Sequence, residues 1–251
     1  SIAKAPLVQP AYYMSSAFEQ GNGAALEVGG PLDAKGRFML RSYVASGSGR
    51  HNGNVGGRFF RDIVGANGEN YSYAIGSQVT FNIKGHYNRL DTPMLYRPVG
   101  LTSSILLGGK WEQRPAERFP ALNVQAIFRW NRLLLWGETY LKYEMNFKSM
   151  QVAYNITMGY LLWSQRLFLV ADYGEYLSGS MKDPPASMGT LATDIRQQRD
   201  ERMFRAALHA YIYRNAGVLT LLYRNQQIFK TRAMDAGGTD HSLHLVAQYR
   251  F

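Results

Sequence analysis

The chain has no cysteine among its 251 residues. Disulfide bonds and thiolate metal sites are therefore excluded. It also has no run of about 18 apolar residues, which is the length that a transmembrane helix needs. Its first residues, SIAKAPLVQP (1–10), lack the charged and then apolar pattern of a secretory leader. We therefore expect either the mature form of an exported protein or a protein that was never exported.

The chain is rich in positive charge and in aromatic residues. Its net charge is +10, and 13% of its residues are aromatic. A basic balance alone suggests nucleic acid, anionic lipid or anionic solutes as partners. The basic residues are spread over many segments rather than clustered, so we expect no nucleic-acid binding.

The last stretch, HSLHLVAQYRF (241–251), alternates strictly between two kinds of residue. Its odd positions are largely apolar and end on Phe251, whereas its even positions carry most of the polar groups. A period of two is typical of a strand whose two faces meet different surroundings. The same period recurs upstream, and most of these segments approach the 9–11 residues with which a tilted strand crosses a membrane. We expect about twelve strands, at 10–20, 25–32, 37–45, 71–84, 103–112, 121–130, 134–147, 151–161, 166–176, 204–214, 218–230 and 237–251.

The connections between these segments also alternate. Short turns are expected at 33–36, 130–132, 163–166 and 214–217, and longer polar links at roughly 47–69, 181–202 and 231–240. Short turns on one side and long loops on the other are typical of outer-membrane barrels. Two stretches fit less well, because 85–100 is long for the short-turn side and 54–68 is either a strand or a loop folded inward. Counting both as strands gives fourteen, and nothing divides residues 1–251 into more than one domain.

The amount of apolar side chain favours a membrane barrel over a soluble one. Large aliphatic and aromatic residues occupy one face of nearly every expected strand, and they would overfill the interior of a soluble barrel. Turned outward into lipid, they need no interior volume. Aromatic residues at strand ends, where interfacial girdles belong, fit the same arrangement: Tyr71, Trp130, Tyr160, Trp163, Tyr249 and Phe251. A soluble β protein with an apolar core is the alternative.

The end of the chain resembles a known signal. HLVAQYRF, with Leu243, Leu245, Ala247, Tyr249 and Phe251, is similar to the C-terminal assembly signal of Gram-negative outer-membrane proteins. This resemblance implies an outer-membrane location, both termini in the periplasm, contact with lipid and lipopolysaccharide, and recognition of Phe251 by the barrel-insertion machinery.

A second resemblance covers about residues 118–251. The order NVQAIFRWNRLLLWGETYLKY, AYNITMGYLLWSQRLFLVADYGE, QQRDERMFRAALHAYIYRNAGVLTLLYRNQQ and HSLHLVAQYRF is similar to the last strands of the phosphate-selective porin O/P family. The resemblance is one of style and order, and that family's arginine-rich constriction has no match here residue by residue. It implies anion selectivity only loosely.

The strand phase predicts which charged residues line the lumen. The expected pore-lining residues are Arg37, Arg41, Lys84, Lys110, Arg129, Lys142, Arg205, Arg224, Lys230, Glu138, Glu144 and Asp172, with Arg250, Glu27 and Glu112 on the same face. Basic residues outnumber acidic ones in this set, and fixed positive charge in a narrow wet channel attracts anions. We expect Arg41, Arg129, Arg205 and Arg224 to lie at mid-strand. The alternative is a lumen whose acids and bases pair with each other and fill it.

The remaining motifs are weaker. Arg58, Arg61 and Asp62 lie around two phenylalanines and could form a constriction loop, or the rings could cover the barrel rim. His241 and Ser242 in the stretch DHS point to opposite faces of a strand, so they cannot act as a catalytic pair. No metal-ligand spacing is present, and we expect no cofactor and no enzyme activity. The sequence thus predicts a single all-β, antiparallel, up-and-down transmembrane barrel that acts as a porin-like channel for small anionic solutes. The alternative is a non-conducting structural or adhesion barrel with partner-binding loops, and oligomeric state is left open.

Overall fold

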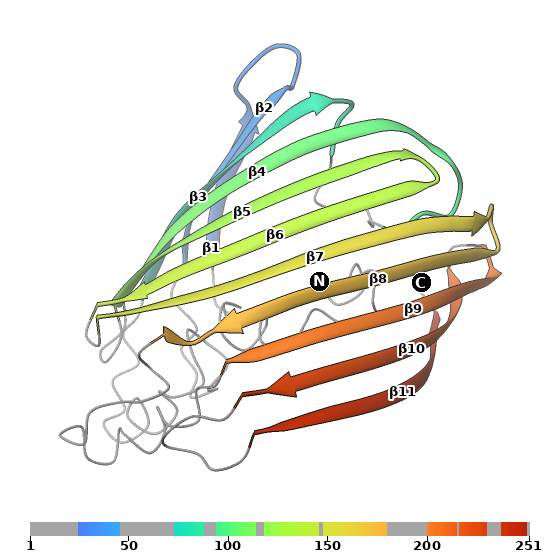
Figure 1. Ribbon diagram of the computed structural model, residues 1–251. Helices are drawn as coiled ribbons and strands as arrows, with labels where there is room; N and C mark the ends of the chain where they lie inside the picture. Colours follow the sequence, from blue (N-terminus) through green and yellow to red (C-terminus); the bar gives the residue numbers. More distant parts are fainter. Residues whose placement is uncertain are drawn as a thin grey trace.

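The computed structural model describes residues 25–45, 73–87, 94–113, 118–145, 148–179, 200–214, 216–229 and 237–249. These residues form one antiparallel sheet of 11 strands that are neighbours in chain order. The sheet curls strongly, so that β1 to β3 lie behind and β7 to β11 in front (Figure 1). The strands are β1 (Ala25–Pro31), β2 (Phe38–Ala45), β3 (Tyr73–Lys84), β4 (Val99–Gln113), β5 (Arg118–Asn131), β6 (Leu133–Glu144), β7 (Ser149–Trp163), β8 (Leu167–Leu177), β9 (Glu201–Tyr213), β10 (Gly217–Ile228) and β11 (Gly238–Tyr249).

The predicted fold class is confirmed: the protein is all-β, with antiparallel up-and-down strands in one sheet. Each expected segment within the described residues contains a strand, whereas segments 10–20 and 54–68 lie outside those residues. The described residues of 85–100 form no strand before Val99, and residues 88–93 lie outside the described part of the chain. Among the described residues, no ladder joins β11 to β1.

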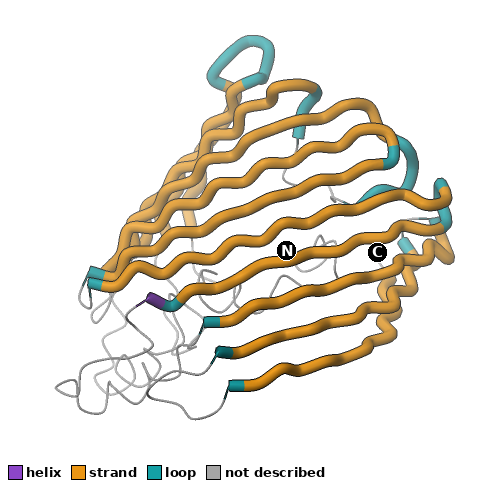
Figure 2. Tube along the Cα trace, in the orientation of Figure 1, coloured by secondary structure: helices purple, strands orange, loops and turns teal. Residues whose placement is uncertain are grey.

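The two ends of the curled sheet differ. The turn end carries the β1–β2, β5–β6, β7–β8 and β9–β10 turns, which lie where the sequence predicts them (Figure 2). The loop end carries the β2–β3, β8–β9 and β10–β11 connections. Two of the expected long links end earlier than predicted, because β9 already begins at Glu201 and β11 at Gly238.

The β1–β2 turn shows how local chemistry makes these connections. Asp33 Oδ1 accepts a hydrogen bond from the backbone N–H of Phe38 at 2.9 Å, and Arg37 Nε donates to Asp33 Oδ2 at 3.3 Å. These two contacts, the backbone one first, hold the pKa of Asp33 below its ordinary value. Gly36 completes the turn with a φ of 64°, a left-handed conformation that glycine adopts at no steric cost.

Aromatic side chains form two bands on the outside of the sheet. At the turn end, Trp130, Tyr160, Trp163, Tyr213 and Tyr249 are all exposed. Nearer the loop end, the ring of Tyr154 lies 6.5 Å from that of Tyr173, and the ring of Phe204 lies 6.5 Å from that of Tyr223. On β7 the turn-end band includes Tyr160 and Trp163, which follow Tyr154 by six and nine residues, or about 20–30 Å along the strand. A tilt of about 40° reduces this to a height of roughly 15–23 Å, which approaches the apolar band of an outer-membrane barrel.

Between these bands the outer surface is aliphatic. The exposed side chains there include Leu107, Leu122, Val124, Ile156, Met158, Leu169, Leu221, Leu243 and Leu245. Within the described residues, no helix has the length and apolar character needed to cross a membrane.

Candidate functional site: the inner face of the sheet

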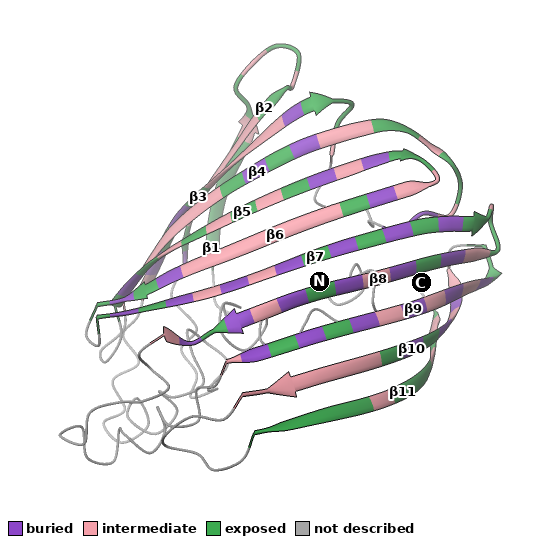
Figure 3. Ribbon diagram, viewed as in Figure 1, coloured by how far each residue is buried: buried purple, intermediate pink, exposed green. Residues whose placement is uncertain are grey.

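Buried and exposed positions alternate along the central strands β7, β8 and β9 (Figure 3). The inner face, which we define as the face turned toward the inside of the curve, carries polar and charged side chains that are almost fully buried. They are Asn82, Ser104, Glu112, Arg129, Lys142, Glu144, Gln151, Asn155, Thr157, Asp172, Glu201, Arg205, His209 and Thr220. Soluble proteins expose such residues and bury the aliphatic ones. Here the polarity of the two faces is inverted.

A buried ion pair lies at the centre of the inner face. The β8–β9 register places Asp172 directly opposite Arg205. Arg205 Nε donates to Asp172 Oδ1 at 3.0 Å, and a second guanidinium nitrogen donates to Oδ2. Asn155 on β7 also donates to Asp172 Oδ2, at 3.5 Å. The two charged side chains are 6% and 3% exposed, so the bidentate geometry compensates much of the cost of removing both charges from water.

A second polar cluster lies beside it on β5 and β6. Glu138 Oε2 accepts a hydrogen bond from Tyr140 Oη at 3.2 Å and from Gln125 Nε2 at 3.4 Å. Gln125 Nε2 also lies 3.3 Å from Tyr140 Oη, so the three groups form a closed triangle. This triangle fixes the Glu138 carboxylate against the wall of the barrel.

Basic side chains near the loop end are held by aromatic and acidic partners. Lys142 Nζ lies 4.1 Å from the centre of the Phe119 ring, and Lys110 Nζ lies 5.2 Å from it. Lys110 Nζ also donates to Glu112 Oε2 at 2.9 Å. Glu144 Oε1 accepts from the backbone N–H of Arg118 at 3.0 Å. These lysines are therefore part of a packed lattice, and their cationic heads gain from the faces of the ring.

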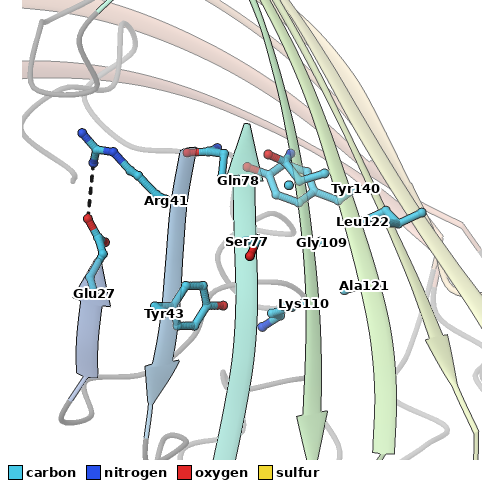
Figure 4. A pocket seen from close by; sticks show the side chains of 12 residues that line it. Glu27, Arg41, Tyr43, Ser77, Gln78, Gly109, Lys110, Ala121, Leu122 and Tyr140 are labelled. Carbon is cyan, nitrogen blue, oxygen red and sulfur yellow. Dashed lines mark ion pairs between the residues drawn. The ribbon is translucent and has the colours of Figure 1, made fainter. Parts of the chain in front are cut away.

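A cavity of about 310 Å³ lies against β1 to β6. Its polar lining includes Arg41, Lys110, Tyr43, Tyr140, Gln78 and Asn123 (Figure 4). Arg41 Nη1 lies 3.5 Å from Glu27 Oε1, and this ion pair is partly exposed on both sides. The two cations on this wall provide donors for a carboxylate, a phosphate or a hydroxylated solute.

Glycine makes room for one of the cavity's rings. A side chain at Gly76 would place its Cβ atom 2.6 Å from the ring of Tyr43, so the ring lies across the bare backbone of β3. Tyr43 and Gly76 are directly opposite in the β2–β3 register. The pairing of a strand glycine with a cross-strand aromatic residue thus fixes Tyr43 against the wall.

The predicted lumen residues do not all share one environment. Arg41, Lys110, Arg129, Lys142, Arg205, Arg224, Glu138, Glu144 and Asp172 lie on the inner face, as do Glu27 and Glu112. Arg37 instead lies in the exposed β1–β2 turn, and Lys84 is exposed at the end of β3 after a bulge that shifts the register. Lys230, Arg250, Phe251, Tyr71 and the possible constriction residues Arg58, Arg61 and Asp62 lie outside the described residues.

The inner face also carries acidic residues that the sequence did not assign to it. Glu201 at the start of β9 is buried and accepts from Gln226 Nε2 at 3.2 Å. Asp240 accepts from Arg224 Nη2 at 2.7 Å. Glu201 falls within the polar link expected at 181–202, and Asp240 lies where the link expected at 231–240 overlaps the strand expected at 237–251. With them included, the described part of the inner face is close to neutral, whereas the sequence suggests a basic surplus.

Another missed feature is apolar. Toward the turn end, inner-face positions of β5 to β10 are occupied by Ile127, Leu134, Leu161, Phe168, Val170, Ala207, Tyr211, Val218 and Leu222. They form one buried cluster with Met94 and Leu95 from the β3–β4 connection. The signal was present in the sequence, because these residues fall on the same strand phase as Arg129, Asp172 and Arg205.

The histidines of β11 lie on both faces of the sheet. His241 Nδ1 lies 2.9 Å from Tyr223 Oη on the outer face, whereas Ser242 lies on the inner face. Ser242 Oγ lies 2.9 Å from His244 Nε2, a contact the sequence did not suggest. However, Arg224 Nε also donates to this oxygen at 3.1 Å, which lowers its strength as a nucleophile.

Comparison with known proteins gives little beyond the fold. No family model matches the chain, and no curated protein matches it. One similar solved structure is described as a KdgM porin, with 12% sequence identity and a TM-score of 0.36. The match covers 92% of this chain and 94% of that one. The resemblance to the phosphate-selective porin O/P family is not confirmed.

Proposed function

We propose that this protein is an outer-membrane channel for the passive diffusion of small, preferentially anionic solutes. The observation that supports it most is the inverted polarity of the sheet, with aliphatic side chains outside and ionised side chains inside. The two aromatic bands support the same proposal, because the distance between them approaches the height of the apolar band of an outer-membrane barrel. Lipid satisfies the outer surface, and the hydrogen bonds between neighbouring strands satisfy the backbone.

The route for solutes runs along the β1–β6 side of the lumen. The cavity of about 310 Å³ lies on this side, and Arg41 and Lys110 are the cations on its wall. Arg205 is less suited to selecting solutes, because its side chain is only 6% exposed beside Asp172, whereas the paired side chains of Arg41 and Lys110 are 30% and 17% exposed. Anion preference therefore depends on Arg41 and Lys110 more than on the mid-strand arginines Arg129, Arg205 and Arg224.

The test is a reversal potential in a planar bilayer under a salt gradient. We expect the wild-type channel to prefer the anion, and Arg41→Glu together with Lys110→Glu to shift the reversal potential toward the cation. Lys35→Glu together with Arg37→Glu is the matched control, because both residues are exposed in the β1–β2 turn and the pair makes the same charge change away from the cavity. A cation-selective wild-type channel, or equal shifts in cavity and control variants, would contradict the proposed selectivity.

The surroundings follow from the same proposal. Lipid and lipopolysaccharide contact the outer surface, the barrel-insertion machinery recognises the C-terminal strand through Phe251, and both termini face the periplasm. Replacing Phe251 with serine tests the second of these, because assembly into the outer membrane should fall while the purified chain still refolds in detergent.

A second function is favoured by a specific observation. Arg41, Lys110, Arg205 and Arg224 each form an ion pair with a carboxylate, and an apolar cluster fills part of the interior. These features suit a non-conducting structural or adhesion barrel that binds partners through its loops. A closed wild-type trace in the bilayer assay supports this alternative against the channel.

A further inference from the structure

We propose that residues Met94–Tyr96 are an internal plug that closes the turn end of the lumen on the β5–β10 side and so sets the conductance. This inference deepens the proposed channel function and rests on it only for the effect on conductance. The buried position of the plug does not depend on whether the protein conducts. The plug itself follows from the contacts of these three residues, which belong to the β3–β4 connection.

Two residues of the segment are almost fully buried. Leu95 is 1% exposed and Met94 is 6% exposed, although both belong to a connection rather than a strand. They share one cluster with side chains of β5 to β10 that point to the inside of the curve. A connection that ran over the rim would expose these residues to water, as connections usually do.

Hydrogen bonds to backbone carbonyl groups hold the segment in place. Tyr211 Oη donates to the carbonyl oxygen of Leu95 at 2.8 Å, and the backbone N–H of Gln165 donates to the carbonyl oxygen of Tyr96 at 2.7 Å. Gln165 belongs to the β7–β8 turn, and Tyr211 to β9. The segment is thus tied to strands far from its own place in the chain, and two of its buried carbonyl groups are satisfied.

Ring contacts complete the fit at both ends of the connection. The rings of Tyr96 and Tyr211 meet edge to face with centres 5.1 Å apart. The Arg129 guanidinium lies 5.6 Å from the centre of the Tyr87 ring. Arg129, predicted to be a pore cation, therefore packs against the plug region. Its position on the inner face alone does not show that it contacts solutes.

The lumen pattern explains why a plug is needed. A water-filled channel lined by Leu134, Phe168 and Val170 would leave a large apolar surface in water, at a cost of about 25 cal/mol for each Å². Met94 and Leu95 cover that surface. None of the described residues that line the cavity at β1 to β6 belongs to this apolar cluster. The plug therefore confines passage to the β1–β6 side.

Protection of an introduced thiol tests the plug independently of conduction. Because the chain has no native cysteine, only the introduced thiol reacts. Leu95→Cys should react with a membrane-impermeant maleimide at least about 100-fold more slowly than Leu32→Cys, because local opening must come first. Leu32 lies at the same end of the barrel and is 61% exposed. Equal labelling rates would overturn the plug whether or not the protein conducts.

Single-channel conductance tests whether the plug limits passage through the channel. Leu95→Asp places a charge in the apolar cluster and should expel the segment, raising single-channel conductance at least about two-fold, whereas Leu32→Asp makes the same change on the exposed turn and should leave conductance unchanged. Unchanged conductance in Leu95→Asp, in a barrel that still resists unfolding in detergent, would overturn the role in conductance. If the thiol of Leu95→Cys is protected and none of the proteins conducts, the plug stands and the channel function fails.

Discussion

Removing the carboxylate of Asp172 should destabilise the barrel strongly. Asp172→Asn keeps the shape of the side chain but leaves the Arg205 guanidinium as an uncompensated charge among side chains that exclude water. The two partners are only 3% and 6% exposed, so little solvent replaces the lost charge. Breaking a buried pair of this kind costs about 3–5 kcal/mol, and we expect the lower end because asparagine still accepts one hydrogen bond.

The measurement is urea unfolding in lipid vesicles followed by tryptophan fluorescence, with the free energy of unfolding obtained by linear extrapolation. The double variant Asp172→Leu/Arg205→Met should recover most of the loss, because it removes both charges and keeps the volume filled. Asp33→Asn is the matched control: it breaks an Arg–Asp pair of the same kind in an exposed turn, where water screens the charges. If Asp172→Asn costs no more than Asp33→Asn, the pair is solvated and our description of the inner face is wrong.

Three further predictions concern single positions. Gly76→Ala should lose about 1–3 kcal/mol of unfolding free energy because its Cβ would meet the Tyr43 ring at 2.6 Å, whereas Gly30→Ala, with no atom within 4 Å, should change it little; equal effects in urea unfolding would refute this. The carboxyl of Asp33 should titrate below about 3.9 by carbon NMR, so its stabilisation of the turn is complete above about pH 5 and is lost as the pH falls through the lowered pKa; a midpoint at or above 3.9 would contradict the turn geometry. Tyr211→Phe removes the hydroxyl that donates to the Leu95 carbonyl. Introduced into the Leu95→Cys variant, it should speed maleimide labelling about ten-fold, which corresponds to a loss of about 1.4 kcal/mol in the free energy of opening the plug. An unchanged rate would show that this hydrogen bond does not hold the plug.

The strands were predictable because most outward positions are apolar over a whole membrane crossing. The alternation of Leu122 and Val124 with Asn123 and Gln125 fixes the phase of β5 by itself, and the structure keeps that phase. The turns at 33–36 and 163–166 were predictable for a related reason, since polar residues and glycine interrupt the alternation there. Exact strand ends were not predictable. Glu201 continues a polar loop in sequence, and only the ladder with β10 shows that it belongs to a strand.

The site was predictable only in part. The inner-face charges follow from strand phase, but their partners do not, since phase says nothing about which acid faces which base. The plug was harder still, because Met94 and Leu95 resemble any apolar pair in a long connection. Its trace in the sequence is indirect: Leu134, Phe168 and Val218 are apolar at positions where a wet lumen would favour polar groups. An apolar inner position on several neighbouring strands indicates that something covers it.

The central claim is that lipid lies outside and water or polar groups lie inside, and β7 tests it most directly. Single cysteines introduced in place of Asn155, Ile156, Thr157 and Met158 carry a fluorophore in vesicles made with brominated lipid, whose bromines quench only nearby labels. Ile156 and Met158 are 57% and 58% exposed, whereas Asn155 and Thr157 are 7% and 2% exposed. Strong quenching at 156 and 158 with weak quenching at 155 and 157 is the predicted result. Quenching that is uniform along the strand, or stronger at 155 and 157, would contradict the account.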